Sequence, residues 1–233
     1  MGWKGKRVVV TGATRGVGYH TTLRFLAAGA CVVGTGKDGQ RLKAVEAEFQ
    51  KKGDFVGVKT DWEDRAAPKT LFDAVAKRWD SVDVLCNNAA VQTWKKDWYD
   101  EGLDLLEQHF RINVLAPHEL IYRFVPLLEK GQEPRIINVG SGAGNFQSLS
   151  TQADMPTYRL TKYTLGGVTL LWAAQLKGKI AVNLLDPGWL KTDLGGPNAP
   201  GEPEDGGQRI WEACELPWEQ TGKFWYGNQE IPF

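Results

Sequence analysis

Short apolar runs alternate with longer amphipathic segments along almost the whole chain, and this alternation restricts the fold more than any other feature. The apolar runs, rich in Val and Ile, are predicted to be strands at 7–11, 31–35, 55–59, 82–87, 135–141, 180–186 and 223–226. Because polar residues do not alternate within them, these strands should be buried on both faces. Helical patterns occupy 17–28, 40–51, 66–78, about 101–128, 157–177 and 204–215. Strand–helix repetition of this kind predicts an α/β fold, a doubly wound parallel sheet with helices on both faces.

The 233 residues fit a single domain, because no linker, internal repeat or low-complexity segment divides them. One long loop is expected around 195–207, a stretch rich in Gly and Pro. It comes too late in the chain to be a domain boundary and is interpreted as a rim or lid of the substrate site. Pro117 lies inside the longest helical pattern, where a proline should kink or split the helix.

Composition gives no indication of a nucleic-acid or membrane partner. Lysine and arginine number 28, as do aspartate and glutamate, so net charge gives no attraction to nucleic acid or to an anionic membrane. No run is long and apolar enough to cross a bilayer, and the first residues lack the apolar core of a signal peptide. Three scattered cysteines favour free thiols in a cytoplasmic protein. His20, His109 and His118 show no metal-binding spacing, and no metal is expected.

A glycine-rich turn follows the first predicted strand and opens the first predicted helix. It reads T-G-A-T-R-G-V-G from Thr11 to Gly18. Gly12, Gly16 and Gly18 allow a tight turn and a close approach of the backbone to a ligand. The N-terminus of the helix then presents free N–H groups to a pyrophosphate. The spacing differs from the commoner G-x-G-x-x-G, but its place between strand and helix favours a Rossmann-type dinucleotide site.

The end of the second predicted strand indicates which dinucleotide binds. An acid that binds the ribose 2′-hydroxyl is usual there, but this chain has Gly36 and Lys37, and Arg15 adds a cation from the glycine turn. Two cations favour a 2′-phosphate, and hence NADP(H) over NAD(H). Asp38 would weaken this preference if it pointed inward. Asp61, after the third strand, is either an acceptor for the adenine amino group or the cap of the next helix.

Tyr158 and Lys162 form the pattern Y-R-L-T-K, which places both side chains on one face of a helix. A phenol has a pKa of about 10, and a neighbouring ammonium lowers it towards the range useful for proton transfer. Ser141 ends the fifth strand, at the sheet edge where open α/β sheets bind ligands. Asn113 lies mid-helix, where asparagine is a poor helix former. It either marks a local kink with Pro117 or contributes a backbone–water contact to a proton relay.

The glycine turn, N-N-A at 87–89, Asn113, Ser141 and Y-x-x-x-K occur in one order and on the expected elements. From residue 6 to the end, the chain resembles a short-chain dehydrogenase/reductase, with 195–204 and the C-terminal residues similar to carbonyl-reductase-like members. The resemblance implies that Tyr158 exchanges the proton and that Lys162 lowers its pKa and holds the nicotinamide ribose. It further implies that Ser141 orients the carbonyl and Asn113 positions a relay water, while hydride passes directly between nicotinamide and carbon.

The implied cofactor site includes the D-P-G-W-L-K-T-D run at 186–193, which in the family lies against the nicotinamide. Its expected residues are Gly12, Thr14, Arg15, Gly16, Val17, Gly18, Lys37, Asp61, Trp62, Asn88, Ala89, Tyr158, Lys162, Pro187, Gly188, Leu190 and Thr192. Two departures from the family pattern stand out. N-N-A-A replaces N-N-A-G, which places Ala90 in the cofactor loop, and a longer interval between Ser141 and Tyr158 lengthens the loop 142–155 at the substrate mouth.

Ten tryptophans are many for this length, and several fall on segments that should surround a substrate. Trp94 and Trp189, with Phe146 and Met155 from the loop after Ser141, predict an apolar, aromatic-lined pocket. For both tryptophans core packing stays an alternative, and core packing is the interpretation for Trp3, Trp79, Trp172 and Trp225. No cation is clearly placed to bind a substrate carboxylate or phosphate, which favours an uncharged hydrophobic ketone or aldehyde.

The sequence therefore predicts an NADP(H)-dependent oxidoreductase that reduces a carbonyl or oxidises the alcohol. Three alternatives stay open: reduction of C=N or C=C on the same scaffold, a cofactor-retaining isomerase or lyase, and a non-enzymatic NADP(H)-binding sensor. The C-terminal residues 223–233 are too apolar for a free tail. They predict a homo-oligomer, a dimer or tetramer, or else a tail folded over its own substrate mouth.

Overall fold

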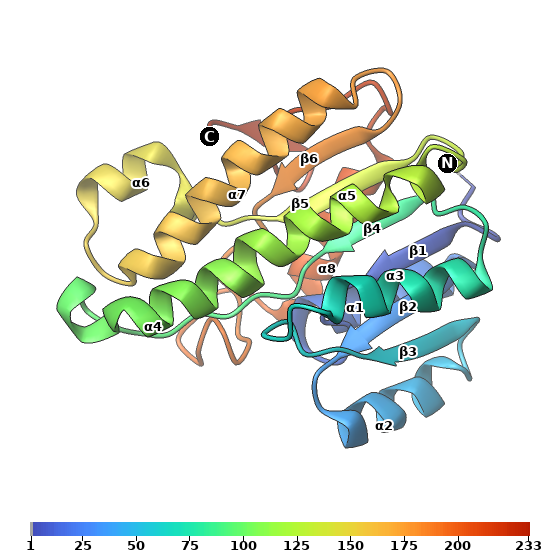
Figure 1. Cartoon of the computed structure of the whole chain (residues 1–233), viewed down its shortest axis with the longest axis horizontal. Helices are drawn as coiled ribbons and strands as arrows, with labels where there is room; N and C mark the ends of the chain where they lie inside the picture. Colours follow the sequence, from blue (N-terminus) through green and yellow to red (C-terminus); the bar gives the residue numbers. More distant parts are fainter. Residues whose placement is uncertain (1) are drawn as a thin grey trace.

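The computed structural model describes residues 2–233, which form one sheet between two layers of helices (Figure 1). Within these residues the sheet has eight strands in the order β3-β2-β1-β4-β5-β6-β7-β8. The strands are β1 Arg7–Val10, β2 Cys31–Gly36, β3 Phe55–Lys59, β4 Val84–Asn87, β5 Arg135–Val139, β6 Ala181–Leu185, β7 Phe224–Tyr226 and β8 Gln229–Ile231. Neighbouring strands from β3 to β7 are parallel, and β8 runs antiparallel to β7. The predicted doubly wound parallel sheet is confirmed.

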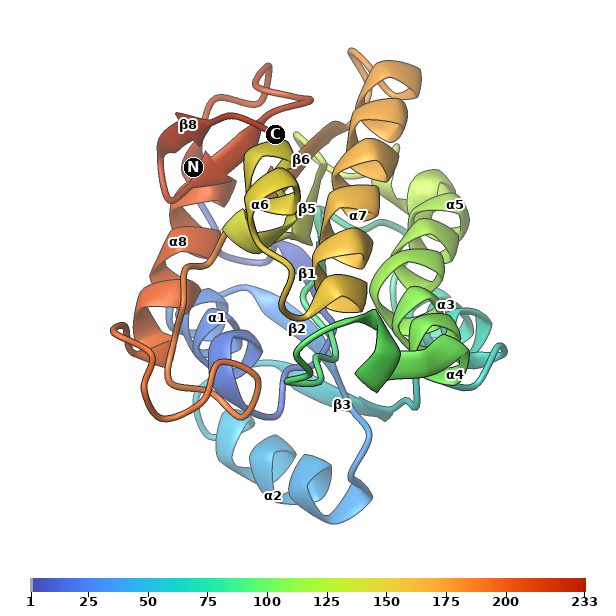
Figure 2. The same cartoon turned by 90° about the vertical axis from the view of Figure 1, so that its left-hand side faces the viewer.

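Helices cover both faces of the sheet (Figures 1 and 2). They are α1 Gly16–Ala27, α2 Gly39–Phe49, α3 Ala67–Arg78, α4 Trp98–Phe110, α5 Ala116–Leu128, α6 Phe146–Thr151, α7 Pro156–Gln175 and α8 Pro203–Glu215, with a 3-10 turn at Gly142–Gly144. Successive strand residues face opposite layers. Val9 packs in a cluster with residues of α3, α5 and α7, whereas Val8 and Val10 pack with residues of α1, α2 and α8. Both faces of the strands are therefore buried, as their unbroken apolar runs predict.

The longest predicted helix is interrupted at Arg111–Leu115, a π-helical turn between α4 and α5. Pro117 lies in the first turn of α5, directly after the π-helical turn, and its missing N–H removes a helical hydrogen bond at that point. The backbone stays helical from α4 into α5, so the helix is locally widened and not split, and Asn113 lies in the centre of the π-helical turn. Such turns occur often at functional sites.

Two expectations about the late part of the chain are corrected. The loop predicted around 195–207 is shorter, because α8 begins at Pro203. A Cβ atom on Gly206 would lie 2.7 Å from a Val17 methyl and one on Gly207 2.8 Å from Cβ of His20, so these glycines allow α8 to pack closely against α1. The C-terminal residues join their own sheet: Trp225 is buried, and the Phe233 ring packs 5.5 Å from that of Phe224. The tail is thus explained within one chain and covers no substrate mouth.

The four tryptophans interpreted as core residues are buried in the structure, which confirms that interpretation. Trp3, Trp79, Trp172 and Trp225 are all buried. Cys31, Cys86 and Cys214 carry free thiols.

Within residues 2–233 no helix combines the length and apolarity needed to span a bilayer. No group of three or more His, Cys, Asp or Glu side chains in that range is placed to hold a metal ion.

The close packing of α1 against α8 gives a stability prediction. Gly207→Ala should destabilise the protein by about 1–3 kcal/mol, because the new methyl would overlap backbone atoms of His20 and Thr21 at 2.9 Å. Gly167→Ala is the matched control: Gly167 lies in α7, and a Cβ atom added there would have nothing within 4 Å. It should stabilise by about 0.5–1 kcal/mol, since alanine favours helix. Urea unfolding measures both, and stabilisation by both variants would contradict the proposed packing.

Candidate active site

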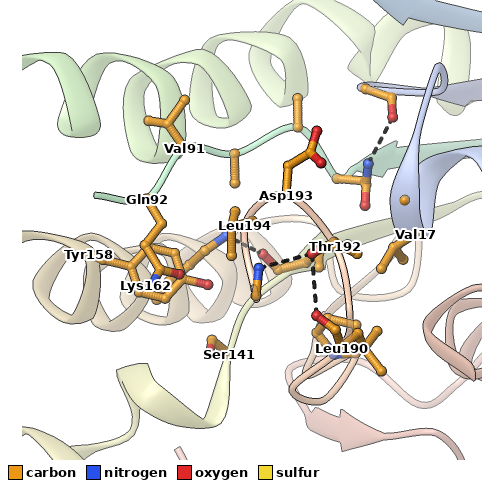
Figure 3. A pocket seen from close by; sticks show the side chains of 18 of the residues that line it. Val17, Val91, Gln92, Ser141, Tyr158, Lys162, Leu190, Thr192, Asp193 and Leu194 are labelled. Carbon is orange, nitrogen blue, oxygen red and sulfur yellow. Dashed lines mark hydrogen bonds between the residues drawn. The ribbon is translucent and has the colours of Figure 1, made fainter. Parts of the chain in front are cut away.

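One cavity of about 820 Å³ opens at the carboxyl ends of the central strands. In Figure 3, Tyr158 and Lys162 lie on one side of it and Val17, Leu190 and Thr192 on the other. All the cofactor residues predicted from the sequence line this cavity except Gly18, which supports the turn from behind. This position is the expected one, since ligands bind where neighbouring parallel strands lead to helices on opposite faces.

The glycine turn is held against the end of β4 by side-chain hydrogen bonds. The Thr11 hydroxyl accepts hydrogen bonds from the backbone N–H groups of Asn88 and Ala89, each at 2.9 Å. The Asn88 amide donates to the Thr11 carbonyl at 2.8 Å, so this side chain joins the ends of β1 and β4. The Asn87 amide similarly donates to Asn138 on β5 at 2.8 Å.

The turn itself has the shape of a phosphate cradle. Gly12 and Gly16 adopt φ of 69° and 53°, which favour glycine. A Cβ atom on Gly18 would lie 2.2 Å from the Gly12 carbonyl oxygen, so only glycine fits there. The N-terminus of α1 has no side-chain cap, and its first N–H groups are therefore available to an anion. These features fit a dinucleotide pyrophosphate.

The adenosine end of the cavity holds ion pairs that the sequence did not reveal. Lys37 contacts the carboxylates of Glu63 at 2.7 Å and Asp61 at 3.1 Å. Hydrogen bonds to these two carboxylates raise the pKa of Lys37. Arg15 pairs with Asp193 across the cavity mouth. Exposed pairs of this kind are worth about 0–1 kcal/mol, so an incoming phosphate can displace them.

Two ambiguities about acidic residues are resolved. Asp38 caps α2, accepting hydrogen bonds from the backbone of Gln40 and Arg41 at 2.8 and 3.0 Å, so its carboxylate is directed at the helix. Asp61 does not cap α3, because the N-cap position of that helix is Ala66 and no side chain makes a capping hydrogen bond there. The helix-cap interpretation of Asp61 is therefore wrong.

Ser141, Tyr158 and Lys162 lie together in the cavity wall. The Ser141 side chain hydrogen-bonds the Tyr158 side chain. Lys162 donates from Nζ to the Val139 carbonyl at 2.8 Å, which fixes the ammonium at the end of β5. Its Nζ lies 5.7 Å from the centre of the Tyr158 ring. The three groups expected to act on a carbonyl are thus brought together by α7 and the end of β5.

Burial controls the ionisation of these groups. Desolvation raises the pKa of Tyr158 to about 12, which the hydrogen bond with Ser141 opposes. Desolvation also lowers the pKa of Lys162 to about 8, which the charge of Asp186 opposes. The expected lowering of the tyrosine pKa by Lys162 is not what dominates here, because removal of the phenol from water outweighs it. The Tyr158 phenol is therefore protonated at neutral pH.

Asp186 is a site residue whose role the sequence did not indicate. It follows β6, and its carboxylate accepts hydrogen bonds from the backbone N–H of Gly188, at 2.9 Å, and of Gly142. A Cβ atom on Gly142 would lie 2.9 Å from Oδ2 of Asp186, so that close contact favours glycine. Burial raises the pKa of Asp186, and the two backbone hydrogen bonds oppose the shift. This carboxylate ties the turns after β5 and β6 to each other.

Asn113 does not line the cavity. Its side chain is buried and exchanges two hydrogen bonds with the backbone of Val91, each at 2.9 Å. Its amide also donates to the Thr161 hydroxyl at 3.1 Å. The side chain therefore connects the segment after β4 to α7. The relay role of Asn113, which would use its backbone, stays a prediction.

Three of the four residues predicted to form an aromatic pocket line the cavity. Trp94 and Trp189 line it, each 54% exposed, so the core interpretation is wrong for both. Their indole N–H groups donate to consecutive carbonyls, Leu194 at 3.1 Å and Gly195 at 2.8 Å. Met155 lines the cavity as predicted. Phe146 does not: its ring is exposed on α6 and lies 6.5 Å from that of Tyr163, so its assignment to the substrate site is wrong.

Comparison with known proteins agrees with this geometry. A family model described as short chain dehydrogenase matches residues 6–203. A short chain dehydrogenase/reductase of Colletotrichum higginsianum, dpchG, is 35% identical over 176 residues, which span 74% of this chain and 64% of that protein. The 1-deoxy-11-beta-hydroxypentalenate dehydrogenase of Streptomyces exfoliatus is 32% identical over 224 residues, 93% of this chain and 80% of its own length.

Solved structures show the same fold. The NADPH-bound carbonyl reductase from chicken fatty liver has a TM-score of 0.89 and 26% identity, and the match covers 99% of this chain and 100% of that one. A short chain dehydrogenase from Burkholderia cenocepacia in complex with NADP has a TM-score of 0.86 at 25% identity, over 98% of this chain and 100% of the other. The resemblance seen in the sequence is confirmed, and the chain belongs to the short-chain dehydrogenase family of oxidoreductases.

Proposed function

We propose that this protein is an NADP(H)-dependent oxidoreductase that reduces a hydrophobic ketone or aldehyde to an alcohol, or catalyses the reverse reaction. The observation that carries the proposal is the convergence of Ser141, Tyr158 and Lys162 on the wall of a cavity whose other end is the glycine turn. A bound nicotinamide would supply or accept the hydride. The chain's own residues bind the cofactor and the substrate, orient the carbonyl and exchange the proton.

Each polar group has a role that its position supports. The Ser141 and Tyr158 hydroxyls hydrogen-bond each other in the free site, and with substrate bound each would donate its one proton to the carbonyl oxygen in place of that bond. Tyr158 then delivers its proton to the developing alkoxide. Lys162, anchored by the Val139 carbonyl, keeps a positive charge near the phenol and is placed to hold the ribose. Trp94 and Trp189 offer half-exposed apolar faces to the substrate.

The alternatives differ in what they would turn over. The intact serine, tyrosine and lysine set argues against a purely non-enzymatic sensor. C=N or C=C reduction would use the same proton donor, and an isomerase or lyase would consume no NADPH. A panel of ketones, aldehydes, imines and enones, followed through NADPH absorbance, tests the proposal. Turnover of imines or enones without any ketone or aldehyde would overturn it.

Tyr158→Phe should lower turnover by about 10²–10⁴-fold, because it removes the proton donor and retains the ring. NADPH affinity should change little. Tyr163→Phe, on the same helix but outside the cavity, is the matched control and should retain activity. Alcohol oxidation in the unmodified protein should rise with pH between about 6 and 8, since the base form of a phenol of high pKa grows tenfold per unit. Wild-type rates in Tyr158→Phe would refute the assignment.

The preference for NADP(H) is part of the proposal. Arg15 and Lys37 line the adenosine end of the cavity, and Gly36 stands where an acid would repel a phosphate. The structural neighbour from chicken fatty liver carries NADPH. Glu63 competes for Lys37 in the structure, and the affinity gained from a 2′-phosphate is reduced by the loss of that ion pair.

Lys37→Ala should weaken NADPH binding by about tenfold to a hundredfold and leave NADH nearly unchanged, since a charged hydrogen bond is worth about 1.5–3 kcal/mol. Glu63→Gln should change NADPH affinity in the opposite direction, because it removes the competing carboxylate. Isothermal titration with both cofactors decides the matter. Equal losses for NADPH and NADH in Lys37→Ala would show that Lys37 does not bind the 2′-phosphate.

We also infer that two copies of the chain associate through the outer face of α4, α5 and α7, in a dimer or as part of a tetramer. Exposed apolar side chains gather there: Tyr99, Leu103, Leu115, Tyr122, Leu170 and Leu171. The helices α4 and α7 lie side by side (Figure 2). Exposed apolar side chains grouped on neighbouring helices are typical of subunit contacts.

The free thiols support a reducing compartment such as the cytoplasm.

Leu171→Glu should convert this oligomer to a monomer, because Leu171 is 74% exposed and a carboxylate in the contact would be desolvated. Lys52→Glu, beyond the end of α2 and far from this face, is the control for a change of charge alone. Light scattering on a sizing column measures both masses. A monomeric unmodified protein would refute the inference.

A further inference from the structure

Arg159, the residue after Tyr158, has a side chain that is 4% exposed. A guanidinium has five N–H donors and cannot lose its charge at physiological pH. Burial of such a group is costly unless its donors are hydrogen-bonded and its charge is paired. The hydrogen-bond acceptors that surround Arg159 therefore indicate its structural role.

All five donors are directed to the segment 142–155 that follows Ser141. Nε donates to the Asp154 carbonyl at 2.7 Å, and Nη1 donates to the Ser148 hydroxyl at 2.6 Å and to the Ala143 carbonyl at 3.3 Å. Nη2 donates to the Asp154 carboxylate at 2.7 Å and to the Gln152 side chain. One side chain thus contacts the beginning, the middle and the end of the segment.

The two ends of the segment are held by other contacts, at Gly142, Gly144 and Met155, but its centre has little besides Arg159 to hold it. Helix α6, which forms its central part, contributes no buried residue. Figures 1 and 2 show α6 outside the main layers, beside α7. Beyond Arg159, the end of the segment is attached by Met155, which donates its N–H to the Lys95 carbonyl at 3.0 Å. The hydrophobic effect therefore supplies little of the energy that keeps α6 in place, and the guanidinium must supply much of it.

The same segment forms one wall of the cavity, through Ala143, Ser148, Gln152, Asp154 and Met155. We propose that Arg159 is a positioning residue that holds segment 142–155 as a preformed wall of the substrate site and so limits the size of substrate admitted. This inference rests on the proposed function. It also means that Arg159, although it lines the cavity, has no free donor for a substrate carboxylate or phosphate, in keeping with an uncharged substrate.

Arginine is needed for this task because the acceptors lie around a plane. Lysine has one nitrogen with three donors and cannot reach acceptors at both ends of the segment. Arg159→Lys should therefore behave like Arg159→Met, which retains an apolar stem and removes every donor. Agreement between the two variants would assign the effect to the hydrogen bonds, since charge is lost in only one of them.

Hydrogen exchange tests the positioning role without any substrate. The amides of Leu149, Gln152 and Met155 are bonded to backbone carbonyls, and in Arg159→Met they should exchange about tenfold faster or more. The amides of α1 and β5 should keep their rates. Arg123→Met is the control, because Arg123 pairs with Glu119 on the surface of α5. Unchanged exchange in the segment, or an equal increase throughout the protein, would overturn the proposal.

Kinetics with two substrates of different size provide the second readout. Arg159→Met should raise KM for a small ketone and broaden acceptance of bulky ketones, with NADPH affinity kept. Ser148→Ala, which removes one acceptor from the segment side, should shift both measurements in the same direction by a smaller amount. Loss of kcat with all substrates to the same extent, at unchanged exchange, would assign Arg159 to Tyr158 rather than to the wall. If no ketone is turned over, the exchange data still decide the role of Arg159.

Discussion

The hydrogen bonds between Thr11 and the Asn88–Ala89 backbone hold together the carboxyl ends of β1 and β4, and the rest of the site depends on them. At this point the chain leaves β1 towards one helical layer and β4 towards the other. The cavity exists because these two paths diverge. A Cβ on Gly12 would lie 3.1 Å from the Asn88 amide, so the glycine turn and the asparagine fix each other's position.

The floor of the cavity balances opposing electrostatic effects. Burial pushes both Lys162 and Asp186 towards their neutral forms, which lowers the pKa of Lys162 and raises that of Asp186. Two effects oppose these shifts: the charge of Asp186 raises the pKa of Lys162, and the backbone N–H groups of Gly188 and Gly142 lower the pKa of Asp186. The Val139 carbonyl accepts a hydrogen bond from the ammonium. Strand ends supply these dipoles in fixed directions. The sheet thus contributes charge stabilisation as well as a scaffold.

The sequence allowed the sheet, most helices and the serine, tyrosine and lysine set to be predicted, because each depends on a local pattern. Strands β1 to β6 show as apolar runs, and the interruption near Pro117 follows from ring sterics. Helix α6 was missed because a six-residue helix with no buried residue has no apolar face to recognise. Phe146 was assigned wrongly because its type suggests burial and the chain does not encode its direction locally.

The residues that the sequence could not reveal are those whose partners are distant along the chain. The pairing of Lys37 with Glu63 depends on β2 and β3 lying side by side. Asp186 gains its role only when the turns after β5 and β6 come into contact. Arg159 looks like an ordinary helical arginine until its burial and its five acceptors are seen.

Segment 142–155 affects how the substrate range of such a protein can change during evolution. Its central helix α6 contributes no buried residue, whereas Gly144 and Met155 near its ends are buried. Substitutions on the exposed side of α6 that keep the acceptors of Arg159 therefore leave the folding energy of the sheet and the catalytic pair almost untouched. The range of substrates can therefore change through substitutions in this short segment, while selection preserves the catalytic residues.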